Sequence, residues 1–356
     1  MAKPRLIAFY LPQFYPTKEN DEWWQKGFTE WTNVGNAKPL FKGHDQPRVP
    51  ADLGYYDLRL PEVREEQAQL AREAGIEGFC YWHYWFAGRR LLDRVFREVV
   101  ENGKPEYPFC LCWANHSWYQ KTWDPSKPNR LLVEQTYPGE QDYIDHFYAM
   151  LPAFKDERSL KVEGRPMFGL YDSFGFKDFH MFKETWNRLA KENGLYDFYF
   201  FGFTFRTECC EDILKMGYDS VAPDYIINFK NEETSLGEKI RRKLFCHPKV
   251  MHYGDYRKYV LTHYTLANNI HPCINPNFDH SPRSRERGVI ICDHSPEKWK
   301  ELCLKVCSLC SQRHGDSNIV FIKSWNEWGE GNYLEPDLKF GKNFIYATRE
   351  AIDSVL

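Results

Sequence analysis

"NIVFIKSWNEW", residues 318–328, joins an uninterrupted apolar run directly to a polar ending that is rich in tryptophan. A run without alternation of apolar and polar residues is typical of a strand that is buried on both faces in a parallel sheet. Seven further runs of this kind precede it, and most are followed by a helical pattern. The eight runs are residues 5–14, 76–86, 108–118, 165–173, 198–205, 219–225, 270–282 and 318–328.

Strands that alternate with helices predict an α/β fold, and eight of them fit a closed (β/α)8 TIM barrel. Helical patterns cover, among others, 61–75 and 89–103, and the first begins with Pro61 and ends at Gly75, as helices commonly do. A doubly wound open sheet is the alternative. The first turn of a dinucleotide-binding sheet is rich in glycine, whereas "YLPQFYPTKEN" (10–20) has none. We therefore favour the barrel.

The 356 residues fit one barrel domain, 1–356. The segments 15–59 and 226–268 are long for connections between strands and helices, so we expect loop insertions over one end of the barrel. The apolar stretch near the N-terminus is too short for a signal peptide and lacks a cleavage site, and no window is long enough to span a membrane. We expect a cytoplasmic protein, with a removed leader left open.

Composition narrows the class of ligand. The formal net charge of −3 argues against a nucleic-acid partner, because proteins that bind nucleic acids are usually basic. Aromatic residues make up 17% of the chain, including 12 Trp, and exposed rings suit sugars. The eleven cysteines lack the spacing of a disulfide scaffold and are expected to be reduced thiols. The expected partner is therefore an oligosaccharide or polysaccharide.

Polar and aromatic residues gather where the apolar runs end. The βα loops of a TIM barrel converge at the carboxyl ends of its strands, where active sites lie. Aromatic rings stack on the apolar faces of sugars, and Asn, Asp and His bond to their hydroxyl groups. The predicted substrate-binding residues are Tyr10, Trp31, Trp82, His83, Tyr84, Trp113, Asn115, His116, Trp118, Tyr171, Asp172, Asp224, Asp279, Trp325, Asn326 and Trp328.

Glu327 and Glu330 stand three residues apart at the last strand end, between Trp325 and Trp328. Cleavage of a glycosidic bond needs one carboxylic acid to protonate the leaving oxygen and one carboxylate on the other side of the sugar. Burial and mutual repulsion can drive the pKa values of such a pair apart. The alternative is that one glutamate only binds a sugar hydroxyl, or pairs with Lys323 or Lys339.

Several stretches resemble the WbsX-type family, which is often described as a lipopolysaccharide or O-antigen glycosyltransferase family. They include "AFYLPQFYP" (8–16), "NDEWWQKGFTEWTNV" (20–34), "FCLCWANHSW" (109–118) and "SWNEWGEGNYLEPD" (324–337). The resemblance spans about residues 4–350. This family is similar to the glycoside hydrolase family 99 endo-α-mannosidases and endo-mannanases. The resemblance implies a (β/α)8 barrel and a retaining mechanism that needs no metal or cofactor.

The resemblance also implies roles for three acids. Glu327 would deprotonate the 2-hydroxyl of the sugar, which attacks C1 to form a 1,2-anhydro sugar. Glu330 would act as general acid and then as general base for water, a substrate-assisted exception to the usual scheme. Glu335 corresponds to a sugar-binding acid. The chain departs from the usual family pattern at His116 and at Phe278–His280, which affects the expected specificity for the sugar.

Parts of the sequence also suggest functions other than the hydrolysis of a glycosidic bond. A glycosyltransferase or transglycosylase of O-antigen synthesis is the first alternative, but the sequence has no DxD-type metal motif or nucleotide cradle. A non-catalytic carbohydrate-binding barrel would lack one of the paired acids. Cys303, Cys307 and Cys310 match an iron–sulfur spacing, yet the same spacing is one face of a helix. The histidines lack metal-ligand spacing, so no metal is predicted (His83, His116, His252 and His280).

Overall fold

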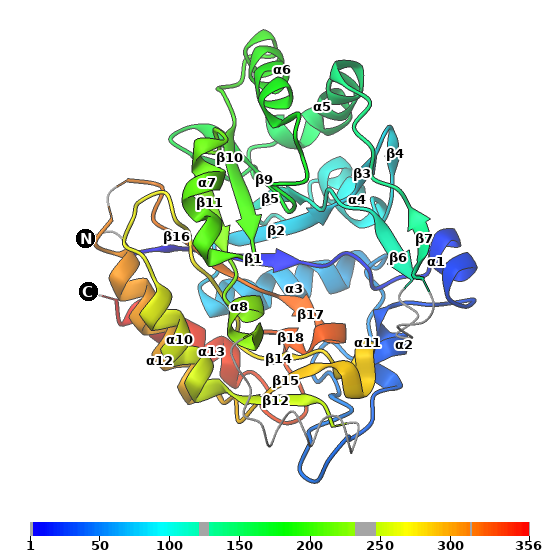
Figure 1. The fold of residues 1–356 in the computed structure, drawn as a ribbon, viewed down its shortest axis with the longest axis vertical. Helices are drawn as coiled ribbons and strands as arrows, with labels where there is room; N and C mark the ends of the chain where they lie inside the picture. Colours follow the sequence, from blue (N-terminus) through cyan, green and yellow to red (C-terminus); the bar gives the residue numbers. More distant parts are fainter. Residues whose placement is uncertain (1–2, 121–127, 232–246, 314, 356) are drawn as a thin grey trace.

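The computed structural model describes residues 3–120, 128–231, 247–313 and 315–355. Its centre is a sheet of eight parallel strands, and each strand lies within one of the eight predicted runs (Figure 1). They are β1 (Arg5–Tyr10), β2 (Gly78–His83), β5 (Phe109–Trp113), β9 (Arg165–Leu170), β10 (Tyr199–Thr204), β11 (Ser220–Pro223), β13 (Cys273–Ile274) and β16 (Ile319–Ile322).

The sheet closes on itself. Its hydrogen-bonded order is β11-β10-β9-β5-β2-β1-β16-β13, which follows the chain around a barrel. Two parallel bridges, Val221 to Ile270 and Asp224 to Cys273, join the two ends. The predicted TIM barrel is therefore confirmed, and the alternative of an open doubly wound sheet is wrong.

A helix follows each barrel strand. In chain order these are α3 (Pro61–Ala74), α4 (Arg94–Asn102), α5 (Glu140–Lys155), α6 (Phe179–Glu192), α7 (Cys210–Lys215), α10 (Tyr253–His263), α12 (Pro296–Cys310) and α13 (Asn343–Asp353). The predicted helix start at Arg89 is wrong, because Arg89–Arg90 form β4, which pairs with β3 (Trp85–Phe86). The three cysteines of the iron–sulfur alternative lie on α12 with buried side chains, as one helical face predicts.

Short elements fill the long connections. The first connection holds α1 (Lys18–Trp23) and α2 (Glu30–Gly35), and the sixth begins with α8 (Ile226–Asn231). Residues 232–246, within the expected insertion 226–268, lie outside the described residues. Further short elements are β6 (Trp118–Gln120), β7 (Arg130–Val133), β8 (Lys161–Val162), η1 (Thr207–Cys209), α11 (Ser281–Ser284), η2 (Arg285–Arg287), β17 (Asn326–Glu327), η3 (Trp328–Glu330) and β18 (Asn332–Tyr333).

Three strands form an accessory sheet beside the barrel, which Figure 1 shows below the barrel strands. Strand β12 (Lys249–His252) pairs in parallel with β15 (Val289–Cys292), and β15 pairs in antiparallel with β14 (Phe278–Asp279). Strand β14 follows barrel strand β13 and leads directly into α11. The accessory sheet therefore supports the loop that follows the seventh barrel strand.

Aromatic side chains fill the barrel. Phe9 stacks on Trp82 with ring centroids 4.6 Å apart, and it also contacts Phe203 and Phe321. Successive residues of a strand point to opposite faces, so the neighbours of these residues point outward. Tyr10 donates a hydrogen bond to Gln67 of α3, at 2.8 Å. Strand alternation thus separates the residues that fill the barrel from those that hold the helices.

Within the described ranges, none of the helices is both long and apolar enough to cross a membrane.

Candidate active site

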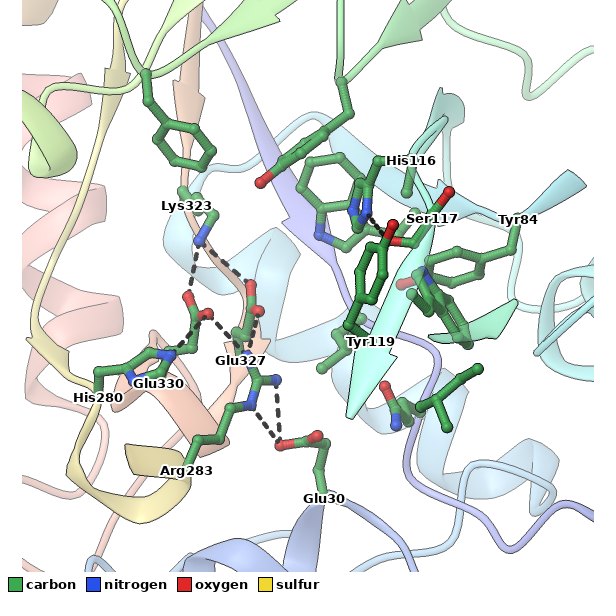
Figure 2. A pocket seen from close by; sticks show the side chains of 18 of the residues that line it. Glu30, Tyr84, His116, Ser117, Tyr119, His280, Arg283, Lys323, Glu327 and Glu330 are labelled. Atoms are coloured by element: carbon green, nitrogen blue, oxygen red, sulfur yellow. Dashed lines mark hydrogen bonds and ion pairs between the residues drawn. The ribbon is translucent and has the colours of Figure 1, made fainter. Parts of the chain in front are cut away.

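A pocket of about 580 Å³ lies at the carboxyl ends of the barrel strands, and Figure 2 shows it from close by. This volume falls in the range of small-ligand sites, which is roughly 300–1,000 Å³. The loops after all eight strands contribute to its lining. Taken in strand order, the lining includes Gln13, Tyr84, His116, Tyr171, Phe205, Ile226, His280 and Glu327. The convergence expected of a TIM barrel is therefore present around one pocket.

Two carboxylates and two cations form one cluster in this pocket. The Lys323 ammonium lies 3.4 Å from Glu327 and 3.0 Å from Glu330. The Arg283 guanidinium, from α11, lies 3.3 Å from Glu327 and 2.7 Å from Glu330. Figure 2 shows the two carboxylates pointing toward the same two cations. Each glutamate is therefore within reach of both positive charges.

The turn between the two glutamates depends on glycine. A Cβ atom at Gly329 would lie 2.0 Å from the Glu30 carboxylate and 2.9 Å from Arg283 Nε. Gly331 ends η3 with φ of 51°, a left-handed conformation that favours glycine. The Ser324 hydroxyl accepts a hydrogen bond from the Glu327 backbone N–H at 2.9 Å. These contacts fix the turn so that both acids face the pocket.

The two glutamates have different proton affinities. Burial raises the pKa of Glu327, and the neighbouring Glu330 charge raises it further. Burial also acts on Glu330, but Lys323, Arg283 and His280 outweigh it and hold the pKa of Glu330 well below its ordinary value. The free protein therefore keeps Glu330 ionised, and a proton shared by the pair resides on Glu327.

The cluster extends to Glu30 and His280, and two of its residues, Arg283 and Glu30, were not singled out from the sequence. Arg283 also pairs with Glu30 at 3.1 Å, and the Glu30 side chain is buried. His280 Nε2 lies 3.7 Å from Glu330. Glu30 immediately precedes the predicted Trp31, and this proximity is the one signal that pointed to it.

An aromatic wall lies across the pocket from the charged cluster. Figure 2 shows Tyr84, His116 and Tyr119 on that side. Trp118 also lines the pocket, with its ring centroid 5.0 Å from that of Tyr84. The ring centroids of Tyr171 and His116 lie 4.9 Å apart. A sugar between the two walls would meet rings on one side and carboxylates on the other.

Seven of the predicted site residues line this pocket. They are Trp82, Tyr84, His116, Trp118, Tyr171, Glu327 and Glu330. The pocket also gains Lys230, His280, Arg283 and Lys323, which lie on loops after the sixth, seventh and eighth strands. His116, one of the departures from the usual family pattern, is thus in direct reach of a bound ligand.

Three predicted residues face the helices instead of the pocket. Tyr10, His83 and Trp113 occupy the strand positions next to inward-pointing residues, and alternation turns them outward. His83 Nε2 lies 2.8 Å from Nε2 of His146 on α5. Trp113 Nε1 donates to the Trp85 carbonyl at 3.0 Å. Tyr10 and His83 thus bond to helices around the barrel, and Trp113 bonds to strand β3.

Four predicted polar residues hold loops in place. Asn115 and Asp172 exchange hydrogen bonds, with the Asp172 N–H donating to Asn115 at 2.8 Å. Asp224 accepts from the Asn275 side chain at 2.9 Å and is fully buried. Asp279 lies 2.8 Å from His44 Nε2, which ties the first long connection to the seventh. None of the four lines the pocket.

The other predicted residues form a buried layer beneath the paired acids. Asn326 exchanges hydrogen bonds with the Leu11 backbone, and Trp325 is fully buried. Trp328 packs against Trp31, with ring centroids 5.4 Å apart. Glu335 accepts hydrogen bonds from Trp328 Nε1 at 2.6 Å, from Gln67 at 2.6 Å and from Tyr56 at 2.9 Å. This layer positions the turn that carries Glu327 and Glu330.

Glu335 gives a test of this layer through pH. Burial raises the pKa of Glu335 to about 7, despite three hydrogen-bond donors. The folded protein then holds a proton that the unfolded chain releases above about pH 4.5, so stability falls as pH rises from there to about 7. Glu335→Gln should remove up to about 3 kcal/mol of this fall. Urea unfolding from pH 4.5 to 7.5 measures it, with exposed Glu350→Gln as control. If Glu335→Gln left the dependence of stability on pH unchanged, the raised pKa of Glu335 would be contradicted.

Comparisons with known proteins agree on the family and the fold. Residues 6–348 match the family described as "Glycosyltransferase WbsX". The chain is 35% identical over 361 residues to the uncharacterized protein WxcX of Xanthomonas campestris pv. campestris strain B100, covering 98% of this chain and 49% of that protein. It thus spans about half the length of the curated relatives it matches.

Two solved structures share the architecture over nearly the whole chain. A glycoside hydrolase family 99 endo-α-mannosidase from Bacteroides thetaiotaomicron matches with a TM-score of 0.58 and 15% identity, over 99% of this chain and 97% of that one. A glycoside hydrolase-like protein matches with a TM-score of 0.62 and 14% identity, over 99% and 94%. At these identities the likeness concerns the fold.

Proposed function

The chain belongs to the WbsX glycosyltransferase family, and we propose that it cleaves a glycosidic bond in an oligosaccharide or polysaccharide, with Glu327 and Glu330 as the catalytic pair. One observation carries this proposal. Both carboxylates face a pocket that is walled by aromatic rings, and both contact the same two cations. A general acid and a base in one pocket are what cleavage of a glycosidic bond requires.

A single proton shared by Glu327 and Glu330 provides both the acid and the base that the reaction needs. With one proton on the pair, one glutamate is an acid and the other a base at the same time, as in other paired carboxylates. We assign to Glu327 the removal of the proton from the sugar 2-hydroxyl, and to Glu330 the protonation of the leaving oxygen. These roles follow from the family resemblance and give retention through a 1,2-anhydro sugar.

The charges of the free protein impose a condition on these roles. Lys323 and Arg283 favour ionised Glu330 and leave the shared proton on Glu327. The proposed roles need the proton on Glu330 when the glycan is bound. A bound sugar must therefore raise the pKa of Glu330, either by excluding water or by displacing a cation such as Arg283, which lies on α11 and also pairs with Glu30. The reverse assignment, with Glu327 as acid, needs no such movement.

Hydrolysis is favoured over transfer for a chemical reason. Transfer from a sugar nucleotide needs groups that hold a diphosphate, usually through a metal or a glycine-rich loop. The positive charges of Lys323 and Arg283, which contact the paired acids, are already balanced by the carboxylates of Glu30, Glu327 and Glu330. A mannose-like α-glycan is the first candidate substrate, because the structurally similar endo-α-mannosidase bears that name.

A panel of bacterial and yeast polysaccharides tests this function. The protein is incubated with each glycan in ¹⁸O-labelled water, and released products are weighed by mass spectrometry. Hydrolysis predicts fragments that carry one labelled oxygen at the new reducing end. Products without label, formed only when an acceptor sugar is added, would support transfer. Binding of a glycan with no product under either condition would support a non-catalytic barrel.

A further inference from the structure

The accessory sheet brings together three potential metal ligands that are far apart in the sequence. His252 ends β12 and lies opposite Cys292, which ends β15, in the parallel register of the two strands. Asp293 follows directly. His252 Nδ1 lies 3.5 Å from Cys292 Sγ and 3.6 Å from Asp293 Oδ1. All three ligand atoms lie within 4.8 Å of one another.

These separations match the edges of a tetrahedral zinc site. Zinc binds histidine nitrogen and carboxylate oxygen at about 2.0–2.2 Å and thiolate sulfur at about 2.3 Å. Two ligand atoms of a tetrahedron at those bond lengths lie about 3.3–3.6 Å apart. The two measured contacts of His252 fall at the upper end of that range. The third separation, between Cys292 Sγ and the Asp293 carboxylate, lies within 4.8 Å, so these two groups would move toward the shared ion on binding.

The geometry argues against a proton relay between the same groups. In a thiol–imidazole–carboxylate relay, one ring nitrogen faces the thiol and the other faces the carboxylate. Here the same nitrogen, Nδ1 of His252, faces both Cys292 and Asp293. One nitrogen that faces both a sulfur and an oxygen is compatible with a cation shared by all three groups.

Neighbouring groups orient the carboxylate. The Tyr253 backbone N–H donates to Asp293 Oδ1 at 2.8 Å, and Lys298 donates to Oδ2 at 2.6 Å. Oδ1, the oxygen that faces His252, keeps a second lone pair for an ion. The His252 side chain is 67% exposed, so an ion can enter from solvent. Thiolate and carboxylate together would balance the charge of Zn²⁺, while Lys298 opposes it from the far side.

We propose that His252, Cys292 and Asp293 bind one Zn²⁺ ion, with water as the fourth ligand. None of the three lines the pocket, so the ion would lie apart from the paired glutamates. It would fasten β12 to β15, and β15 pairs with β14, which leads to His280 and to Arg283. The Cys292 thiol loses its proton on binding, and that proton passes to solvent.

Titration calorimetry of the metal-free chain with zinc chloride tests the site. We expect one ion per chain, a higher unfolding temperature with zinc, and a thiolate-to-metal absorption band when Co²⁺ replaces it. Cys292→Ser should weaken binding at least about tenfold and abolish the band. Cys209→Ser, which changes another half-buried thiol, should leave both unchanged.

A second variant guards against a folding defect. Asp293→Asn keeps the shape of the side chain and should also weaken zinc binding by about tenfold or more. Its unfolding temperature without zinc shows whether the fold is intact. No stoichiometric binding at about 100 μM zinc would overturn the proposal. So would zinc binding that is equally tight in the wild type and in Cys292→Ser.

Discussion

Glu330→Gln should lower turnover of the true glycan by about 10²–10⁴-fold, the usual contribution of a general acid. The amide keeps the size of the side chain and cannot protonate the leaving oxygen. Glu327→Gln should cause a loss of similar size, because the amide cannot accept the 2-hydroxyl proton. Glu211→Gln, an exposed position on α7, serves as control and should retain full activity.

The leaving group separates the two roles. In an aryl glycoside, a phenol of low pKa can leave without being protonated. Cleavage of such a substrate therefore does not need the general acid. Under the proposed assignment, Glu330→Gln recovers the first release of phenol from this substrate, although the later step with water stays slow, and Glu327→Gln does not recover it. Recovery by Glu327→Gln alone would reverse the roles, in agreement with the charges of the free protein. If neither variant lost activity on the glycan, the pair would not be catalytic.

Lys323→Met should destabilise the fold by about 3–5 kcal/mol at neutral pH, the cost of breaking a buried ion pair from one side. Lys323 is 5% exposed and contacts both glutamates, which stay behind without one of their two cations. Lys339→Met is a matched control. Lys339 forms a 3.0 Å ion pair with Asp45 on the surface, where such pairs contribute about 0–1 kcal/mol.

The effect of Lys323→Met should depend on pH in a defined direction. In the wild type, the lowered pKa of Glu330 stabilises the fold above the ordinary glutamate pKa, and this stability is lost as pH falls through the folded value. Without Lys323 the pKa of Glu330 rises, and protonation removes the uncompensated charge. Urea unfolding should therefore show the largest difference near pH 7 and a smaller one near about pH 4. A difference that grows toward acid pH would contradict this electrostatic picture.

The barrel could be predicted because each strand is apolar on both faces. The runs 76–86 and 318–328, for example, are more apolar than the sequence around them. Eight strands of this kind, alternating with helices, fit a closed (β/α)8 barrel. The start of α4 was misplaced because "RRLLDR" has helical composition, yet Arg89–Arg90 pair with β3 through a local hairpin. Tertiary pairing outweighed helix propensity there.

The site could be predicted only in part. Residues at strand ends, such as Glu327, Tyr171 and His116, were placed by the geometry of the fold. His83 was included because position alone did not distinguish inward from outward residues, although alternation from Trp82 would have excluded it. Arg283 lies four residues after the end of β14, on the short helix α11, whose position depends on the accessory sheet. Nothing local in the sequence brings it to the acids.

The most direct test of the central claim measures binding and cleavage of one glycan by the double variant Glu327→Gln/Glu330→Gln. A glycan cleaved by the wild type is used, and both proteins are prepared in the same way. If the two glutamates are the catalytic pair, the double variant binds this glycan within about tenfold of the wild-type affinity and releases no product. Continued release of the same product at a comparable rate would contradict this assignment.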